Sequence, residues 1–543
     1  MPSAIHAAPL TLVTPGEFSR VPESLRWPGP HAETVHGPIV PADVRAGDPV
    51  AAFVRVPGCS RRATTAPVWR ISPLGVELVR PAELDGIGLG AELELVLRVG
   101  RSTVEFRSLP VVSTRSEHGR ALLGLTWATE DADRPPLADG RSAPRWRCDG
   151  EYAPTGIAPS AARYGDYVFF RVVDVSWLGL RLETSLRNKF LLPGLRFDAT
   201  CTFPTHGQVQ LGLRVVHVNV VRRGEKLVLS VGAQYEARSA RAQETIGQYL
   251  LQFGSGATVS ELCAAGFRIS ASSRALDFGT VRSAEEYEEV LRLRRLAYVH
   301  ARKLSEDTKD VDMADGFDAR SRILVVRHRG RAVATSRLMF PQPGADDRLN
   351  HEDYLPLPAG LPPRDQLVEV FKTCTHPAYR GSDLFSTFLQ HIGLTILQSG
   401  RRYALMSATD GLARVYERFG FRRLGASYDH PRMQLRHHLM LLDVSSVVGA
   451  RRIGPIAWNL VAGRELWSFA RLCGAVPGDR RSVARVRLYA LFRPLAAVVR
   501  ALYARRMRRA DRRPQVPALR ITSATGSSSN RGEKSGNSGA RAE

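Results

Sequence analysis

Two stretches in the first half of the chain alternate apolar and polar positions in short runs, which is the period of half-buried β-strands. Each stretch has the same order: a strand, a Ser-x-x-Gly turn, a second strand, and a glycine before a long strand. The runs include VWRISPLGVELV and AELELVLRV in the first stretch and DYVFFRVVDVS and LRFDATCTF in the second. The repeated order predicts two copies of one small antiparallel β-barrel, at 46–132 and 140–255.

A mixed α/β pattern follows at 276–445. A long run of helical spacing begins after Ser283, which is its predicted N-cap. A hairpin is expected to turn at Arg329-Gly330, and a later helix to end at Gly400. The remaining elements are the strands LVEVFKTCTH and RYALMSAT and the helix LARVYERFGF. The pattern predicts one α/β domain.

The other segments flank or join these domains. Pro, Gly and Ala dominate an extended lead-in at 1–45, and a linker is expected at 256–275 after the helical run that closes the second barrel. Residues 446–509 have the pattern of basic amphipathic helices, and 510–543 lack core-forming residues and should be disordered. The predicted fold class is therefore multidomain: two small antiparallel β-barrels, an α/β domain and C-terminal basic helices.

The charge of the chain indicates its kind of partner. Lys and Arg number 76 against 53 Asp and Glu over 543 residues, a net charge of +23. This excess favours phosphate-rich ligands, an acidic carrier protein, nucleic acid or an anionic membrane surface. With 44% apolar and 24% charged residues, the composition excludes wholesale disorder and a fibrous repeat.

Cysteine usage and hydropathy indicate a compartment. None of the six cysteines forms a Cys-x-x-Cys pair or lies near a histidine at ligand spacing, so we expect no metal site and no disulfide framework. No apolar run reaches 18 residues, and the N-terminus lacks the pattern of a signal peptide. We therefore expect a cytoplasmic protein, with peripheral contact at the inner membrane face as an added possibility.

Two groups of residues in the second barrel suit a nucleotide ligand. Arg141 and Arg145 lie in a loop before the barrel, and Asp174, Ser176 and Gly179 lie at a strand-to-turn junction. Guanidinium groups can fork onto phosphates and stack on bases, while Asp and Ser side chains can bond the edge of a guanine. The alternative is that the arginines are solvated and that the second group only closes a β-turn.

These residues resemble the PilZ family, whose pattern is Arg-x-x-x-Arg followed by Asp/Asn-x-Ser-x-x-Gly. The resemblance, over roughly 140–240, implies that the five residues bind cyclic di-GMP. The first barrel resembles the family more weakly, because Arg70 stands where the Asp is expected before Ser72 and Gly75. It is expected to be a degenerate copy, used for packing or dimerisation.

A phosphate-binding turn is predicted in the α/β domain. A strand passes through Arg380, Gly381 and Ser382 into a helix, and this geometry aims backbone N–H groups and the helix dipole at one point. With the later Tyr416-Glu-Arg-Phe-Gly-Phe, the turn resembles the GNAT acyltransferase superfamily. The resemblance implies that the turn binds coenzyme A or pantetheine, and that Tyr416 protonates the leaving thiolate. A plain core aromatic is the alternative for Tyr416.

The turn departs from the superfamily pattern twice. Ala378 stands where Gln or Arg is expected and Asp383 where Gly or Ala is expected. A carboxylate beside a pyrophosphate is unfavourable, so Asp383 is predicted to cap the helix instead. These departures favour the single phosphodiester on the pantetheine arm of an acyl carrier protein, although acyl-coenzyme A remains an alternative donor. Cys374 and His376, which flank this region, are interpreted as a packing and a turn residue.

A further ordered set resembles the acyl-homoserine-lactone synthases and, more closely, the long-chain N-acyl amino acid synthases. The set is Arg294, Asp315, Asp318, Arg337, Glu369 and Lys372. The resemblance covers roughly 276–443 and implies transfer of a fatty acyl group from acyl carrier protein to an amino acid. Glu369 would take the amine proton and the cations would hold the amino acid's carboxylate. The alternative is a structural salt-bridge cluster in a catalytically inactive fold.

The C-terminal helices carry an apolar stripe between dense arginines. The stripe comprises Leu488, Leu491, Phe492, Leu495, Val498, Val499, Leu502 and Tyr503. Such a stripe can lie in an anionic membrane interface or pack on the protein's own core, whereas nucleic acid is disfavoured. Pro494 is expected to kink the helix.

Together these patterns predict a cyclic di-GMP-responsive N-acyltransferase. Its partners would be acyl carrier protein, an amino acid, cyclic di-GMP and an anionic membrane surface, with no tightly bound cofactor. The alternative function is a non-catalytic cyclic di-GMP effector whose GNAT-like domain only binds a partner.

Overall fold

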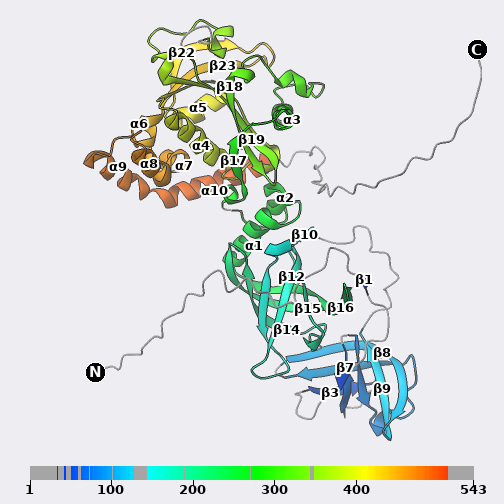
Figure 1. Cartoon of the computed structure of the whole chain (residues 1–543). Helices are drawn as coiled ribbons and strands as arrows, with labels where there is room; N and C mark the ends of the chain where they lie inside the picture. The colour runs from blue at the N-terminus through cyan, green and yellow to red at the C-terminus, as the bar shows by residue number, and fades with distance from the viewer. Residues whose placement is uncertain are drawn as a thin grey trace, which may run out of the picture. The chain divides into compact units, whose positions relative to one another are not determined.

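The computed structural model divides the chain into two compact units, Met1–Phe253 with Ala265–Phe267 and Gly254–Ala264 with Arg268–Glu543 (Figure 1). Arg141, most of the predicted lead-in and all but the first residue of the predicted tail lie outside the described residues. The structure describes residues 33–34, 42–43, 50–58, 63–72, 74–100, 102–127, 143–148, 150–188, 190–269, 271–342 and 348–510.

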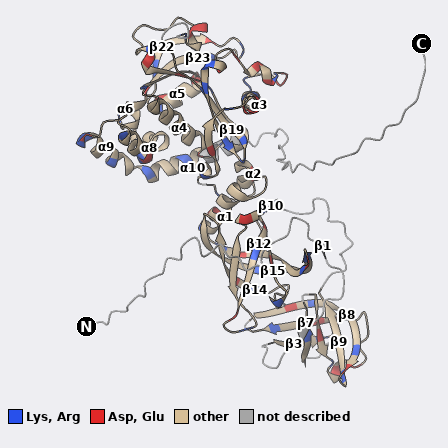
Figure 2. Cartoon of the chain, in the orientation of Figure 1, with Lys and Arg blue, Asp and Glu red and all other residues tan. Residues whose placement is uncertain are grey.

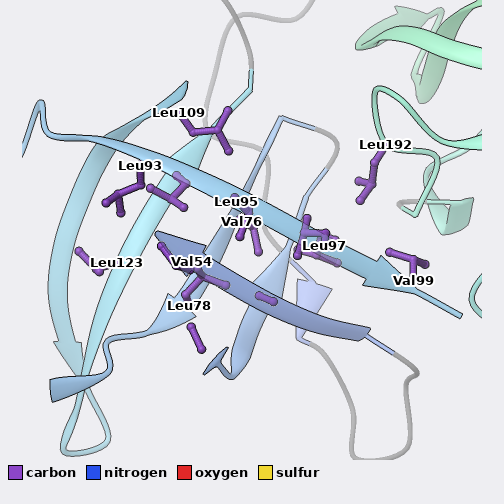
Figure 3. Packing of buried hydrophobic residues seen from close by; sticks show 14 of the residues in the cluster. Val54, Val76, Leu78, Leu93, Leu95, Leu97, Val99, Leu109, Leu123 and Leu192 are labelled. Carbon is purple, nitrogen blue, oxygen red and sulfur yellow. The ribbon is translucent and has the colours of Figure 1, made fainter. Parts of the chain in front are cut away.

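The first unit begins with an eight-stranded antiparallel sheet in the order β2-β5-β6-β9-β8-β7-β3-β4. Its strands are β2 (Ala42–Asp43), β3 (Val50–Arg55), β4 (Thr64–Ala66), β5 (Val68–Ile71), β6 (Gly75–Val79), β7 (Glu92–Val99), β8 (Ser102–Glu117) and β9 (Arg120–Thr126). Alternate side chains of β7, from Leu93 to Val99, are fully buried. The cluster that they form also takes in Phe190 and Leu192 from the second sheet's connecting segment (Figure 3).

The second sheet has the order β1-β15-β14-β11-β12-β13-β16, and β10 pairs with β12. The pairing of β15 with β16 closes the path into a barrel, as the sequence predicted. The strands are β1 (Glu33–Thr34), β10 (Arg145–Arg147), β11 (Thr155–Pro159), β12 (Tyr167–Ser176), β13 (Gly179–Ser185), β14 (Arg196–Phe203), β15 (Gly207–Arg223) and β16 (Lys226–Arg238). Helix α1 (Ala240–Phe253) follows, and its buried Tyr249 donates a 2.9 Å hydrogen bond to the carbonyl of Tyr152.

The Ser-x-x-Gly turn has the same geometry in both sheets. In the second sheet, Ser176 Oγ lies 3.2 Å from the N–H and 3.1 Å from the carbonyl oxygen of Gly179. In the first sheet, Ser72 Oγ lies 3.1 and 3.2 Å from the same groups of Gly75. A Cβ at Gly179 would lie 2.2 Å from the carbonyl oxygen of Ala233 on the neighbouring strand. The serine and glycine therefore have a structural role that both copies need.

Gly179→Ala should destabilise the first unit, because the added methyl group forces β13 away from β16. We expect a loss of about 1–3 kcal/mol, the usual cost of overpacking a rigid site. Thermal unfolding of the full chain measures it, and Gly88→Ala is the control because a Cβ there meets no atom within 4 Å. Equal unfolding temperatures for the two variants would contradict this reading of the turn.

The second unit contains a seven-stranded sheet in the order β17-β18-β19-β20-β21-β23-β22, in which only β20 and β21 are parallel neighbours. Its strands are β17 (Asp277–Thr280), β18 (Ser321–His328), β19 (Arg331–Met339), β20 (Leu367–Thr375), β21 (Tyr403–Thr409), β22 (Arg422–Asp429) and β23 (Arg436–Asp443). The β20–β21 ladder ends at the pair Glu369–Leu405, although both strands continue for several residues beyond it. The two strands therefore part at Glu369, and one edge of β20 is left unused by that ladder.

Three helices of this unit lie in the segments that the sequence indicated. They are α3 (Ala284–His300), α4 (Leu384–Gln398) and α5 (Asp410–Arg418), although α5 begins two residues earlier and ends three residues earlier than predicted. Ser283 caps α3 by accepting the N–H of Glu286, and Gly400 follows α4 with a positive φ. The β18–β19 hairpin turns at Arg329 and Gly330, whose φ angles are 52° and 78°. These three local predictions are confirmed.

The segment predicted as a linker, 256–275, is structured. It contains α2 (Val259–Ala264), where Thr258 and Glu261 exchange capping hydrogen bonds. It then forms a short turn, Ser272–Ala275, that is bonded to Asp383. The expectation of a plain linker was wrong because the capping residues of so short a helix resemble ordinary loop residues.

Five helices complete the second unit: α6 (Val444–Val448), α7 (Pro455–Val461), α8 (Gly463–Leu472), α9 (Arg480–Ala490) and α10 (Arg493–Ala510). Pro494 was expected to kink a helix, and this expectation was wrong. It lies in the first turn of α10, where its missing N–H costs no hydrogen bond. Within the described part of the chain, no helix has both the length and the hydropathy needed to cross a bilayer.

Candidate functional site

A buried ion cluster lies where α3 faces β19 and β20. Arg294 of α3 is fully buried and binds Asp318 through two hydrogen bonds, of 2.7 and 3.3 Å. The hydroxyl of Tyr287, which precedes Arg294 on the same helix, donates to the same carboxylate at 2.8 Å. Asp318 therefore accepts hydrogen bonds from two side chains of one helix, and its position is fixed by them.

Arg337 and Lys372 complete the cluster. Arg337 of β19 is fully buried and lies 2.5 Å from Asp315 and 3.4 Å from Asp318. Lys372 of β20 lies 2.8 Å from Asp315 and 3.4 Å from Asp318, and it also donates to the carbonyl of Met313. The structure thus brings together all five residues predicted to bind the amino acid substrate.

The cluster has an excess of one positive charge, with three cations against two carboxylates. Its open side is formed by Asp315 and Lys372, whose side chains are 31% and 13% exposed. Lys372 has a φ of 52°, a left-handed conformation that is uncommon for a non-glycine residue. The pairing of β20 with β19 also shifts its register between Thr335 and Arg337 of β19. The strand is therefore bent at the point where its lysine joins the cluster.

The cluster also sets the titration of its carboxylates. Burial alone would raise the pKa of Asp318, but the charge and hydrogen bonds of Arg294, with Lys372 and Arg337, lower that pKa to about 2. The pKa of Lys372 is lowered, first by burial and then by repulsion from Arg294. The lysine is thus the cation of the cluster that is held least firmly in its charged form.

Asp318 should make the fold sensitive to acid. Because its pKa is lower in the folded than in the unfolded chain, its contribution is present above about pH 4 and is lost as the pH falls toward 2. The expected loss between pH 5 and pH 3 is about 1 kcal/mol. Urea unfolding at pH 5 and pH 3 measures it. Asp318→Asn should show a smaller pH dependence than the wild type, and equal dependences would contradict the assignment.

Glu369 lies in surroundings that differ from the expected ones. Its side chain is fully buried, and one oxygen accepts the N–H and the Nδ1 of His351 at 2.8 and 2.5 Å. The other oxygen accepts the N–H of Asn350 at 2.9 Å. Burial would raise the pKa of Glu369, but His351 and these hydrogen bonds lower it overall. The carboxylate that was predicted to face a substrate amine instead faces His351.

His351 was missed by the sequence reasoning. It lies in a short turn, Asn350–Asp353, within the long β19–β20 connection, and no motif marks it. Asn350 joins this pair to the ion cluster, because its side-chain oxygen accepts from Arg337 while its N–H donates to Glu369. The cluster and the Glu369–His351 pair are therefore parts of one hydrogen-bonded network.

The predicted phosphate turn leads from β20 into α4. Gly381 has a φ of 73°, Ser382 Oγ accepts the N–H of Leu384, and Arg380 contacts His300 at 2.8 Å. Asp383 is the N-cap residue of α4, as expected, but its side chain makes no capping hydrogen bond. Its carboxylate instead accepts from the N–H and hydroxyl of Ser272 and from the hydroxyl of Ser273 at 3.0 Å. Its charge is thus directed at the Ser272–Ala275 turn.

The remaining residues of interest in this unit are Tyr416 and Cys374, which are buried, and His376, which is partly buried. Tyr416 of α5 packs against Phe421, and burial raises the pKa of its hydroxyl to about 12. Burial likewise raises the pKa of Cys374 to about 12, and it lowers that of His376 to about 4. Both values fit the packing and turn roles. Across the described ranges, no group of three or more His, Cys, Asp or Glu side chains is arranged to hold a metal ion.

The second barrel brings two arginines onto one carboxylate. Arg145 lies on β10, opposite Ser176 of β12, and its guanidinium binds Asp174 at 2.8 Å. Arg181 of β13, which sequence reasoning missed, binds the other oxygen of Asp174 at 2.7 Å. Asp174 is 6% exposed, whereas the two arginines are about one-third exposed. The arrangement therefore presents two guanidinium groups held by a buried anion.

The first sheet, whose strand order is an open path, lacks this arrangement. Arg70, which replaces the aspartate, binds Glu117 through two hydrogen bonds of 2.8 and 3.1 Å and lies 3.8 Å from Glu77. The position thus carries an arginine held by acids, instead of an acid held by arginines. The Ser-x-x-Gly turn is thus common to both sheets, whereas the charged residue before it differs.

Comparisons with solved structures each cover about a third of this chain. The chain is similar to the MrkH–c-di-GMP complex of K. pneumonia, with 18% identity, 37% of this chain and 86% of that chain covered, and a TM-score of 0.19. It is also similar to FeeM, an N-acyl amino acid synthase from uncultured soil microbes (14% identity, 31% and 90% covered, TM-score 0.25). A third similar structure is an acyl-CoA N-acyltransferase from Pseudomonas aeruginosa (20% identity, 31% and 99% covered, TM-score 0.24).

A comparison with curated proteins gives no match. The family model described as "Acetyltransferase (GNAT) domain" matches residues 293–390, from the middle of α3 to the first half of α4. This range contains every residue of the ion cluster, which extends from Arg294 to Lys372 along the chain. Residues 293–390 of the second unit thus match the model of a GNAT acetyltransferase domain.

Proposed function

We propose that the second unit transfers a fatty acyl group from a thioester to the amino group of an amino acid. The observation that carries the proposal is the ion cluster. Its excess positive charge would be balanced by the carboxylate of the amino acid, entering from the side of Lys372 and Asp315. A carboxylate held there would orient the amine, which lowers the entropic cost of the reaction.

The thioester would lie where β20 and β21 part. Backbone N–H groups on that edge of β20 are free of the β21 ladder and can bind the carbonyl oxygen as its negative charge develops. Arg380, Gly381, Ser382 and the first turn of α4 would hold the donor's phosphate. Because Asp383 is bonded to two serines, it opposes a phosphate less than its charge suggests, and acyl carrier protein or coenzyme A can serve. Tyr416 would return a proton to the leaving sulfur.

Cells that overproduce the chain provide the test. Lipid extracts analysed by mass spectrometry should contain an amphiphilic fatty amide of an amino acid, and cells that produce Lys372→Ala should contain much less. Absence of any such amide from both extracts would contradict the proposal. It would favour the non-catalytic effector, in which the domain binds a partner only.

For the second barrel we propose cyclic di-GMP as a regulatory ligand. Arg145 and Arg181 are already positioned by Asp174 and partly exposed, so they can turn their free N–H groups toward phosphates without first being ordered. Asp174 and Ser176 are buried: Asp174 positions the two arginines, and Ser176 stabilises the turn beside them. Gly179 acts through the close approach of β13 and β16.

For the C-terminal helices we propose contact with an anionic membrane. All eight residues of the apolar stripe are exposed, with Leu491 at 74% and Leu502 at 58%, which supports a membrane surface over packing on the core. Arginines gather along α9 and α10, and the segment 480–510 contains no Asp or Glu (Figure 2). Apolar side chains flanked by cations match a bilayer of anionic lipids.

Vesicle sedimentation tests this surface. The full chain should bind phosphatidylglycerol vesicles and lose affinity with added salt, while binding phosphatidylcholine vesicles weakly. Replacing Leu491 and Leu502 with Ser should weaken binding by about 10-fold or more. The matched control replaces Leu89 and Val112, two exposed apolar residues of the first unit. Equal loss in the two double variants would contradict the assignment.

A further inference from the structure

Two buried imidazole nitrogens lack hydrogen-bond partners near the point where β20 and β21 part. They are Nε2 of His351 and Nε2 of His437, and both belong to one cluster of rings. Tyr428 connects them, since its ring lies 6.4 Å from that of His351 and 5.5 Å from that of His437. Leaving a buried polar atom unpaired costs about 1–3 kcal/mol, so two in one cluster indicate that a polar group binds there.

The partner of the other nitrogen fixes the state of His351. The Glu369 carboxylate accepts a hydrogen bond from Nδ1 of His351. In the neutral ring the proton is therefore on Nδ1, and Nε2 carries a lone pair. The Glu369 carboxylate also stabilises the positive charge that appears when Nε2 takes a proton. The ring is held in place by Phe371, whose centroid lies 5.1 Å away. His351 is thus oriented as a proton acceptor with a carboxylate behind it.

The position of this nitrogen fits the acyl transfer. Glu369 is the last residue of β20 that pairs with β21, and Phe371 lies on β20 just beyond. Asn350, which precedes His351, binds Arg337 of the ion cluster. His351 is therefore linked through Asn350 to the cluster proposed to hold the amino acid, and it contacts Phe371 on the strand proposed to hold the thioester. In contrast, both oxygens of Glu369 are already occupied.

We infer that His351, and not Glu369, takes the proton from the attacking amine, an assignment that rests on the proposed acyl transfer. The amine nitrogen forms a bond to the thioester carbonyl carbon, and its proton moves to Nε2 of His351. The carbon–sulfur bond then breaks, and the sulfur takes a proton from the proposed donor, Tyr416, and leaves as a thiol. The imidazolium returns its proton to Tyr416, directly or through solvent. Glu369 is a positioning residue, which orients the ring and stabilises its charged form.

His351→Asn is the most selective variant. The amide nitrogen of Asn lies near the place of Nδ1, so the hydrogen bond to Glu369 can persist while Nε2 is removed. The measurement uses palmitoyl-acyl carrier protein with two acceptors: a mixture of the twenty amino acids, and hydroxylamine, which is largely unprotonated at neutral pH. We expect about 10²–10⁴-fold slower amide formation and a much smaller loss of hydroxamate formation.

Controls separate chemistry from folding. His391→Gln, a half-buried histidine on α4, should form both products at the wild-type rate. Thermal unfolding reports whether the His351 variant is folded, and if it is not, Glu369→Gln is measured instead, with the same selective loss expected. Equal losses with both acceptors, or none, would overturn the assignment. Wild-type protein that forms neither product would overturn the proposed function and the assignment with it.

Discussion

Asp318→Ala should lower the free energy of unfolding of the second unit by about 3–5 kcal/mol, because it leaves the buried guanidinium of Arg294 without its anion. Arg294 and Arg337 are both fully buried, and Asp318 is the only carboxylate bonded to Arg294 among the described residues. A guanidinium in such surroundings cannot lose its charge, so the cost appears in stability instead of in titration. Denaturant unfolding measured at pH 7 tests this.

The matched control is Asp310→Ala. Asp310 also pairs with an arginine of α3, at 2.6 Å, but both side chains of that pair are about 40% exposed. Its loss should cost less than about 1 kcal/mol. If the two variants unfold at the same denaturant concentration, the cluster is not a buried ion network, and the proposed substrate site is contradicted.

Arg145→Ala should weaken binding of cyclic di-GMP by about 10- to 150-fold, the range expected when a hydrogen bond to a charged group is lost. The fold should persist, because Arg181 still pairs with Asp174 at 2.7 Å. Isothermal titration calorimetry on the full chain gives the affinity directly.

The control is Arg187→Ala. Arg187 is on the same barrel and pairs with Asp166, which precedes the other end of β12, so it tests a loss of charge without a loss of the site. Its affinity for cyclic di-GMP should equal that of the wild type. Unchanged affinity in Arg145→Ala, or an equal loss in both variants, would contradict the assignment of the nucleotide site.

The sequence predicted the residues of the ion cluster but not their surroundings. Arg294, Asp318 and Lys372 were identified by their order along the chain, and order survives in a sequence whatever the distance between the residues. The partner of Glu369 was missed because His351 contacts it from a connection without periodicity, where no spacing rule applies. Arg181 was missed for a different reason: it faces Asp174 directly on the neighbouring strand β13, but it lies outside the Asp-x-Ser-x-x-Gly motif on which the prediction was based.

Local rules predicted the element boundaries well, and they failed where a tertiary contact decides. Ser283 caps its helix and Gly400 ends another, because both act on neighbouring backbone groups. Asp383 has the sequence position of a cap, yet its carboxylate binds Ser272 and Ser273, over a hundred residues away. Such a choice depends on which donors the fold brings near, and a single sequence does not contain that information.

Acyl transfer by the purified chain is the most direct test of the central claim. The protein is incubated with palmitoyl-acyl carrier protein or palmitoyl-coenzyme A and the twenty amino acids, with and without cyclic di-GMP, and the products are analysed by mass spectrometry. The account predicts an N-palmitoyl amino acid in at least one condition, and about 10²-fold less with Lys372→Ala. Intact donor and no amide in every condition would contradict it.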